Sequence, residues 1–172
     1  MVAACAGGGA VVAIMASDYE AMAALLYNVA KFVEWPSKAL PETSPSLVLC
    51  ILGEDPIGAA LDQDLQGKKV NGKELVIKQY REVQDIEGCH ILFIGASERQ
   101  RLAEIFHTLN HSSVLTVAHM ERFANLGGMI NFIIRDNKVQ FEINVDAAER
   151  AGLKMSSKVL KFAKIVRGGE KN

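Results

Sequence analysis

Acidic and hydroxyl side chains follow two apolar runs of the chain, and their positions could support two kinds of chemistry. Glu54 and Asp55 end the run that begins at residue 46, and Ser97 ends the run that begins at residue 89. An acid pair at the end of a strand could hold a magnesium ion. A serine at a sharp strand-to-helix turn could act as a nucleophile. Each chemistry requires further residues at defined positions.

Neither of these two chemistries is complete. A phosphoacceptor domain of this topology needs an aspartate after the third predicted strand, where this chain has Gly95-Ala-Ser97. A nucleophile elbow needs Gly-x-Ser-x-Gly, and Arg99 stands in place of its second glycine. We therefore predict that Ser97 caps a helix that begins there, because a serine hydroxyl can accept from the free amides of a first helical turn.

Patterns for phosphate and zinc are also incomplete. The first strand is followed by Gly53-Glu-Asp-Pro56 in place of a glycine-rich dinucleotide loop, and this acid pair would repel phosphate. His107 and His111 have the helical i, i+4 spacing, but no glutamate follows His107 as it does in zinc metalloproteases. Surface histidines near a helix C-terminus are the simpler interpretation. We predict a protein with no catalysis, no cofactor and no metal site.

The elements that would position these residues are those of an α/β domain. Residues 46–52 and 89–94 form nearly continuous apolar runs, which are typical of strands buried on both faces of a parallel sheet. Strands are also predicted at 74–80 and 113–118. Apolar spacing, caps and prolines predict helices over 18–35, 56–66, 97–109, 146–151 and 157–166, the last with Phe162 facing inward. A hairpin of 129–134 and 138–143 follows the parallel strands, with 138–143 as an edge strand.

This pattern predicts a three-layer α/β sandwich with a mostly parallel sheet ending in an antiparallel hairpin, and with the first and last helices packed across it. At 172 residues the chain suits one domain. The net charge is −1 and no block of basic residues occurs, so nucleic acid is not an expected partner.

The first 17 residues are apolar, rich in small residues and free of charged side chains. They are too short to span a bilayer and resemble the hydrophobic part of a secretory signal without its basic n-region. We predict a leader over 1–17, export to the periplasm and one domain over 18–169. Val2-Ala-Ala-Cys5 also resembles a lipoprotein box, but a chance cysteine in an apolar leader is the simpler interpretation of Cys5.

Cys50 and Cys89 lie in neighbouring predicted strands. Cys50 precedes Gly53 by three residues and Cys89 precedes Gly95 by six. If the two glycines lie at one level, the cysteines are roughly 10 Å apart along the strands and on opposite faces. That exceeds the reach of a disulfide, about 7 Å between Cα atoms. A slip in register would bring the cysteines together, so free thiols and a disulfide both remain open.

A ligand site, if there is one, is predicted beyond the carboxyl ends of the parallel strands, where chain direction reverses. The residues expected to line this crevice are Gly53, Glu54, Asp55, Gly95, Ser97 and His119.

Three stretches of the chain resemble one known family. They are Tyr27-Asn-Val-Ala-Lys-Phe-Val-Glu-Trp-Pro36, the hairpin from Gly127-Gly-Met-Ile-Asn-Phe132 to Phe141-Glu-Ile-Asn144, and the segment 147–161. In this order they are similar to the YfiR/HmsC-like family, over residues 19–166. The resemblance implies a small periplasmic protein, often a homodimer, that represses an inner-membrane diguanylate cyclase through its periplasmic domain. It also implies that an outer-membrane partner such as a lipoprotein relieves the repression.

The resemblance extends to particular residues. Family members carry cysteines at positions similar to Cys50 and Cys89, which favours a disulfide, while a further cysteine pair found in some members is absent here. Phe32 and Trp35 are candidate partner contacts, although packing in the core is the simpler interpretation of both. Exposed apolar surface on the hairpin is the alternative contact. A periplasmic sensor that binds a small ligand is the alternative function.

Overall fold

The computed structural model describes residues 16–168. Cys5 and most of the predicted leader therefore lie outside the described residues.

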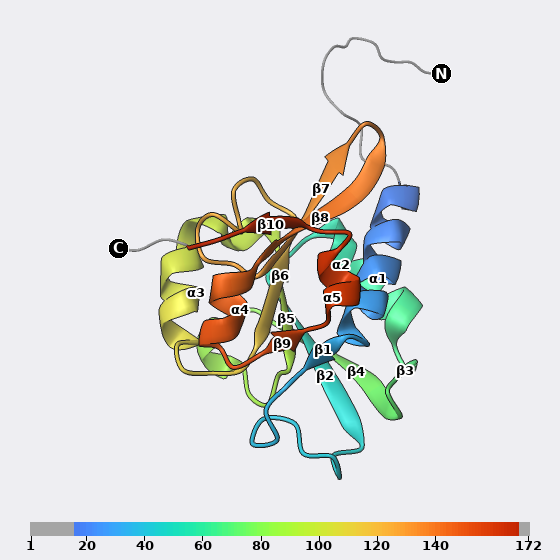
Figure 1. Ribbon diagram of the computed structural model, residues 1–172, viewed down its shortest axis with the longest axis vertical. Coiled ribbons are helices and arrows are strands. Elements are labelled where there is room, and N and C mark those ends of the chain that lie inside the picture. Colours follow the sequence, from blue (N-terminus) through green and yellow to red (C-terminus); the bar gives the residue numbers. More distant parts are fainter. Residues whose placement is uncertain (1–15, 169–172) are drawn as a thin grey trace.

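A mostly parallel sheet forms the centre of the protein (Figure 1). Its strands are β2 (Ser46–Leu52), β3 (Lys69–Val70), β4 (Lys73–Tyr80), β5 (Ile91–Ile94), β6 (Leu115–Ala118), β7 (Ile130–Arg135), β8 (Lys138–Asn144) and β10 (Lys164–Val166). They lie in the order β10-β8-β7-β6-β5-β2-β4-β3, with antiparallel pairing only between β7 and β8 and between β3 and β4 in this sheet. A separate antiparallel pair joins β1 (Val33–Glu34) to β9 (Lys154–Met155).

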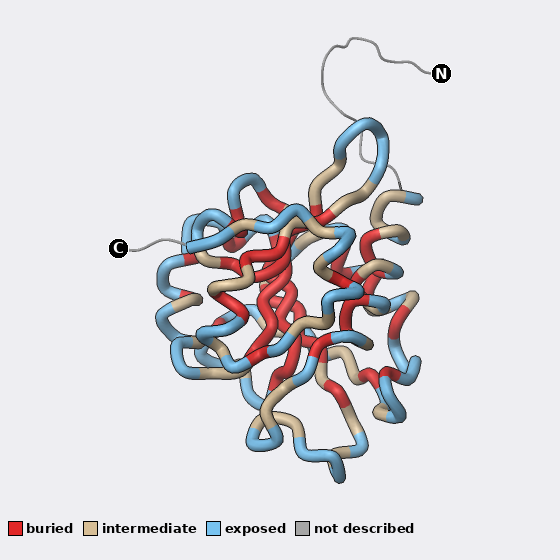
Figure 2. Tube along the Cα trace, in the orientation of Figure 1, coloured by how far each residue is buried: buried red, intermediate tan, exposed pale blue. Residues whose placement is uncertain are grey.

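Helices cover both faces of the sheet and complete the three layers. They are α1 (Ala16–Ala30), α2 (Pro56–Leu65), α3 (Leu102–Thr108), α4 (Val145–Arg150) and α5 (Ser157–Leu160), with 3-10 turns η1 (Val83–Asp85) and η2 (Ala96–Arg101). One apolar core joins α1, α2, α4 and α5 to the sheet, and a second core joins α3 to the opposite face. Figure 2 shows the sheet as the buried centre of the molecule. The predicted three-layer α/β sandwich is confirmed.

The first helix is shorter than its apolar spacing predicts. It ends at Ala30, and the turn that follows is closed by the N–H of Phe32 bonding to the carbonyl of Val29 at 2.9 Å. Val33 then pairs with Met155 across β1 and β9. The prediction of helix as far as Trp35 is wrong because this distant strand supplies hydrogen bonds to the backbone that compete with the helical ones.

The C-terminal segment also differs from its prediction. The helix predicted over 157–166 is only α5, a single turn, and β10 follows it. Ile165 of β10 pairs in parallel with Ile143 of β8, so β8 is not the edge strand. Phe162, expected to face inward, is 77% exposed because it lies between the two short elements.

Candidate functional site

An apolar groove lies between α1, β8 and the segment around α5. Its volume is about 430 Å³, and it is lined by Leu25, Asn28, Val29, Phe32, Phe141, Lys158, Val159, Lys161 and Phe162. Phe32 is 38% exposed and Phe162 is 77% exposed, which makes them two of the most exposed large apolar side chains among the described residues. Water therefore contacts apolar surface that a binding partner could cover.

Lysines provide the charge of this groove. The Nζ of Lys158 lies 5.8 Å from the ring centroid of Phe32, within range of a cation–π contact. Lys161 is a second lining residue, and the lining contains no aspartate or glutamate. The groove thus combines an apolar floor with a positive rim.

Backbone contacts bring the two exposed aromatic residues of the groove, Phe32 and Phe162, together. The N–H of Ser156 donates to the carbonyl of Phe32 at 3.0 Å, directly beside the β1–β9 pair. The hydroxyl of Ser156 accepts from the N–H of Lys158 at 3.1 Å and caps α5. This turn sets the position from which Lys158 and Phe162 reach the groove.

Trp35 lies outside the groove. Its indole Nε1–H donates to the carbonyl of His90 at 3.0 Å, and its ring meets the His90 ring edge-on, with 6.3 Å between centroids. The side chain is half-buried against the main core. Of the two predicted partner contacts, only Phe32 lines the groove. The sequence signal for Phe162 and its neighbours is weak, since it consists of three lysines at 158, 161 and 164 around one aromatic residue.

The strand ends hold a second candidate site, a polar crevice of about 500 Å³. It is lined by Gly53, Glu54, Gln79, Tyr80, Arg81, Glu82, Ser97, Glu98 and Arg101. Three of the six residues predicted from the sequence, Gly53, Glu54 and Ser97, are among them. His119 is not, and its Nδ1 lies 2.9 Å from the carbonyl oxygen of Phe132.

Hydrogen bonds between loops occupy the polar atoms at the edge of this crevice. The two carboxylate oxygens of Asp55 accept from the N–H groups of Ile57 and Ala96, each at 3.0 Å. The hydroxyl of Ser97 accepts from the N–H of Glu54 at 2.9 Å and donates to Glu98 at 3.1 Å. The predicted helix-capping role of Ser97 is therefore wrong, because this hydroxyl joins two loops instead.

Close backbone approach explains the glycine after β5. A Cβ on Gly95 would lie 2.7 Å from the carbonyl oxygen of Glu54, so a side chain there would push the two loops apart. The buried carboxylate of Glu98 pairs with Arg101 at 3.0 Å, which compensates its charge. Hydrogen bonds thus join the loops around the crevice, and its buried charge is already neutralised.

Cys50 and Cys89 are joined by a disulfide, with 5.9 Å between their Cα atoms. The sequence-based distance of roughly 10 Å on opposite faces is wrong. Gly53 and Gly95 do lie at one level, because Leu52 pairs with Ile94. Cys89, however, lies before β5 begins at Ile91, so its distance from Cys50 does not follow from the rise per residue of a strand.

His90 follows the disulfide and joins three segments. Its Nδ1 accepts from the N–H of Val48 at 2.9 Å, and its Nε2 lies 3.1 Å from the carbonyl oxygen of Ala39. Both contacts are satisfied by the neutral ring with its proton on Nε2. Burial lowers the pKa of His90; the hydrogen bond to Ala39 opposes this shift, and the charge of Lys73 adds to it.

We expect stability to fall as the pH drops below about 6.5, the ordinary pKa of histidine. The lowered pKa of folded His90 means that the unfolded chain binds the proton first. The contribution is fully present above pH 6.5 and declines, by at most about 1.4 kcal/mol per pH unit, until the folded pKa is reached. Urea unfolding between pH 7.5 and 5 measures this slope. His90→Gln should reduce it and His107→Gln should retain it; equal slopes in both variants would contradict the assignment.

Within residues 16–168, no group of three or more His, Cys, Asp or Glu side chains is arranged to hold a metal ion. No helix in the same range is long and apolar enough to cross a membrane.

An α/β domain with an exposed apolar groove has the construction of a protein that binds other molecules at its surface. The model of the YfiR/HmsC-like family matches residues 19–164, and the chain belongs to this family. It is a family of periplasmic, non-catalytic regulators that act on diguanylate cyclase signalling.

Two solved structures have similar folds. An ABC domain from Streptococcus pneumoniae, in complex with L-Trp, has a TM-score of 0.52 at 10% identity, over 81% of this chain and 61% of that one. A conserved domain protein from Vibrio cholerae has a TM-score of 0.57 at 12% identity, over 87% of this chain and 60% of that one. This chain spans about three fifths of the length of each. At such identities the likeness concerns the fold alone.

Proposed function

We propose that this protein represses an inner-membrane diguanylate cyclase by binding the periplasmic domain of that enzyme through the apolar groove. The observation that carries the proposal is the pair of exposed aromatic residues, Phe32 and Phe162, beside Lys158 and Lys161. Aromatic anchors supply much of the binding energy in protein interfaces. A positive rim favours a partner whose contact segment is apolar and flanked by acidic residues.

Repression across a membrane requires a preference for one state of the enzyme. The repressor must bind the inactive conformation of the cyclase more tightly than the active one. A preference of about 2.7 kcal/mol shifts the equilibrium constant a hundredfold. Family membership supports two further parts of the proposal, which are a homodimer and an outer-membrane lipoprotein that sequesters the repressor.

Reversing the charge of the groove rim should abolish repression. We expect a Lys158→Glu/Lys161→Glu variant, expressed in a strain lacking the wild-type gene, to leave cyclic-di-GMP and biofilm growth at the level of the deletion strain. Both lysines are exposed, so the fold should tolerate the change. Mass spectrometry of cyclic-di-GMP gives the readout, and Kd for the purified periplasmic domain of the cyclase should rise at least tenfold.

Lys38→Glu/Lys138→Glu is the charge-matched control, because both lysines are exposed and neither lines the groove. It should repress like the wild type. Deletion of the gene for this protein should raise cyclic-di-GMP, and deletion of the cyclase gene in the same strain should abolish that rise. Full repression by the folded groove variant would exclude this surface, and unchanged cyclic-di-GMP on deletion of the gene would exclude the function.

A second candidate function is that of a periplasmic sensor for a small ligand bound at the crevice. The specific observation that favours it is the volume of about 500 Å³ beside Gly53, Glu54 and Ser97. The Streptococcus chain with a similar fold is in complex with L-Trp, which makes L-Trp a reasonable first probe. Crosslinking and purification from membranes separates the two functions. A stably bound cyclase supports the repressor, whereas a retained metabolite supports the sensor.

A further inference from the structure

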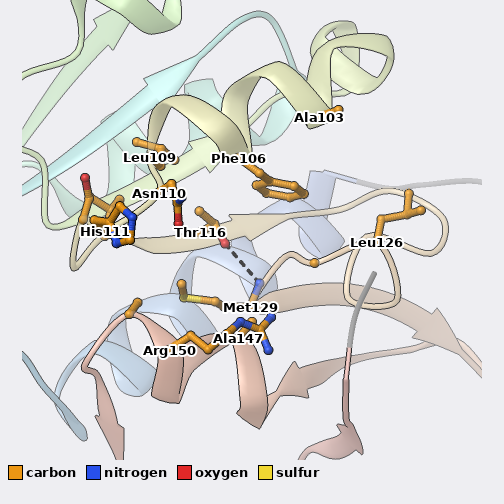
Figure 3. A pocket seen from close by; sticks show the side chains of 14 residues that line it. Ala103, Phe106, Leu109, Asn110, His111, Thr116, Leu126, Met129, Ala147 and Arg150 are labelled. Atoms are coloured by element: carbon orange, nitrogen blue, oxygen red, sulfur yellow. Dashed lines mark hydrogen bonds between the residues drawn. The ribbon is translucent and has the colours of Figure 1, made fainter. Parts of the chain in front are cut away.

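A separate cavity of about 400 Å³ opens between α3 and α4, away from both the groove and the crevice (Figure 3). It arises where β6 and β7 diverge, because these strands pair only at Val117 with Ile130 and at Ala118 with Asn131. Its volume lies in the usual range for small-molecule sites, about 300–1,000 Å³. Apolar side chains form much of the wall, including Phe106, Leu109, Val114, Leu126 and Met129.

Thr116 places an incompletely satisfied hydroxyl in this cavity. Its side chain is 3% exposed, and its oxygen accepts from the N–H of Met129 at 3.0 Å (Figure 3). Within residues 16–168 its own O–H has no hydrogen-bond acceptor. A buried donor without an acceptor is destabilising, and this cost is removed when a bound molecule accepts from it.

Arg150 supplies a cation at the same cavity. It projects from the end of α4, across the cavity from Phe106 (Figure 3). No hydrogen bond or ion pair to another described residue occupies its guanidinium. The lining includes His111 but no aspartate or glutamate. The charged side chain at the cavity therefore has free donors and no carboxylate to neutralise it.

We propose that this cavity binds a small amphipathic carboxylate, with its carboxylate at Arg150 and Thr116 and its apolar body against Phe106, Leu126 and Met129. An anionic acceptor satisfies both free donors, and an arginine–carboxylate contact is among the stronger hydrogen-bonded pairs. The apolar wall then covers the hydrocarbon part of the ligand. A neutral alcohol would forgo the ion pair, and an amine would be repelled by Arg150.

Calorimetry on the full chain with sub-micellar decanoate tests the proposal. We expect saturable binding of decanoate, at least tenfold weaker binding of 1-decanol, and none of decylamine. Arg150→Leu should weaken decanoate binding at least tenfold, whereas Arg135→Leu, an exposed arginine outside the cavity, should leave it unchanged. Thr116→Val should weaken binding several-fold, and Thr116→Ser, which keeps the hydroxyl, should restore it.

Three results would overturn the assignment. They are no decanoate binding by the folded wild-type chain, equal affinity for decanoate and decylamine, or equal decanoate affinity in the Arg150→Leu and Arg135→Leu variants. A thermal unfolding scan of each variant without ligand distinguishes lost binding from lost structure. Repression of the cyclase is measured separately through the groove variants, so failure of one idea leaves the other intact.

Discussion

Replacing both Cys50 and Cys89 with alanine is expected to lower the free energy of unfolding by about 4 kcal/mol. The two residues are 39 positions apart, and closing a loop of that size restricts the unfolded chain strongly. Both side chains are buried in the second core, where alanine keeps the Cβ atoms. The loss corresponds to a shift of roughly a thousandfold in the folding equilibrium.

Urea unfolding with and without a reductant measures this effect. The reduced wild type should approach the stability of the double variant, and the variant itself should not respond to the reductant. An oxidising compartment such as the periplasm keeps the bond formed. A loss below about 1 kcal/mol, or a variant that remains sensitive to reductant, would show that the cross-link contributes little.

Substituting alanine for Gly128 is expected to destabilise the protein by about 1–3 kcal/mol or more, the usual cost of overpacking a core. A Cβ at this position would overlap the ring of Phe123. That ring is fully buried and packs against Phe106, with 5.8 Å between centroids, so it has little room to move. The N–H of Gly128 also donates to the carbonyl of Phe123 at 2.9 Å, which fixes the backbone beside the ring.

A double-mutant cycle with Phe123→Leu identifies this clash as the cause. Phe123→Leu alone should lower the free energy of unfolding. Combined with Gly128→Ala, it should restore part of the stability that Gly128→Ala loses. Gly128 is not among the glycines with positive φ, so its loss is expected from the clash alone. Gly72→Ala gives the cost of backbone strain without a clash for comparison, since its φ is +83° and no atom lies within 4 Å of the added Cβ. Strictly additive losses at 123 and 128 would show that the ring and the glycine do not interact.

The sequence alone predicted the long buried elements. The apolar run 46–52 forms β2, and both its faces are covered, as six successive apolar residues require. Asp55 caps α2 as the Asp-Pro pair indicates. The Gly127-Gly128 pair indicates a turn, and Gly127 has the φ of +117° that favours glycine. The close contact between Gly128 and the ring of Phe123 depends on where the folded chain places that ring, which local sequence patterns do not indicate.

The candidate sites were less predictable than the fold. Gly53, Glu54 and Ser97 meet at one crevice because parallel strands bring their carboxyl ends to one edge of the sheet. The groove, by contrast, depends on the β1–β9 pair, which joins residues far apart in the sequence through strands of two residues each. Strands this short have no measurable hydrophobic period, so Phe162 was assigned to a helix that ends before it.

The sequence by itself thus determined the layers, the parallel core strands and the family, because each depends on runs long enough to carry a period or a motif. Tertiary structure decided the end of the first helix, the parallel addition of β10 and the approach of Cys89 to Cys50. In these places hydrogen bonds or a covalent bond from distant segments override weak local preference. The groove and the cavity between α3 and α4 arise in the same way, since each is enclosed by elements that only the folded chain brings together.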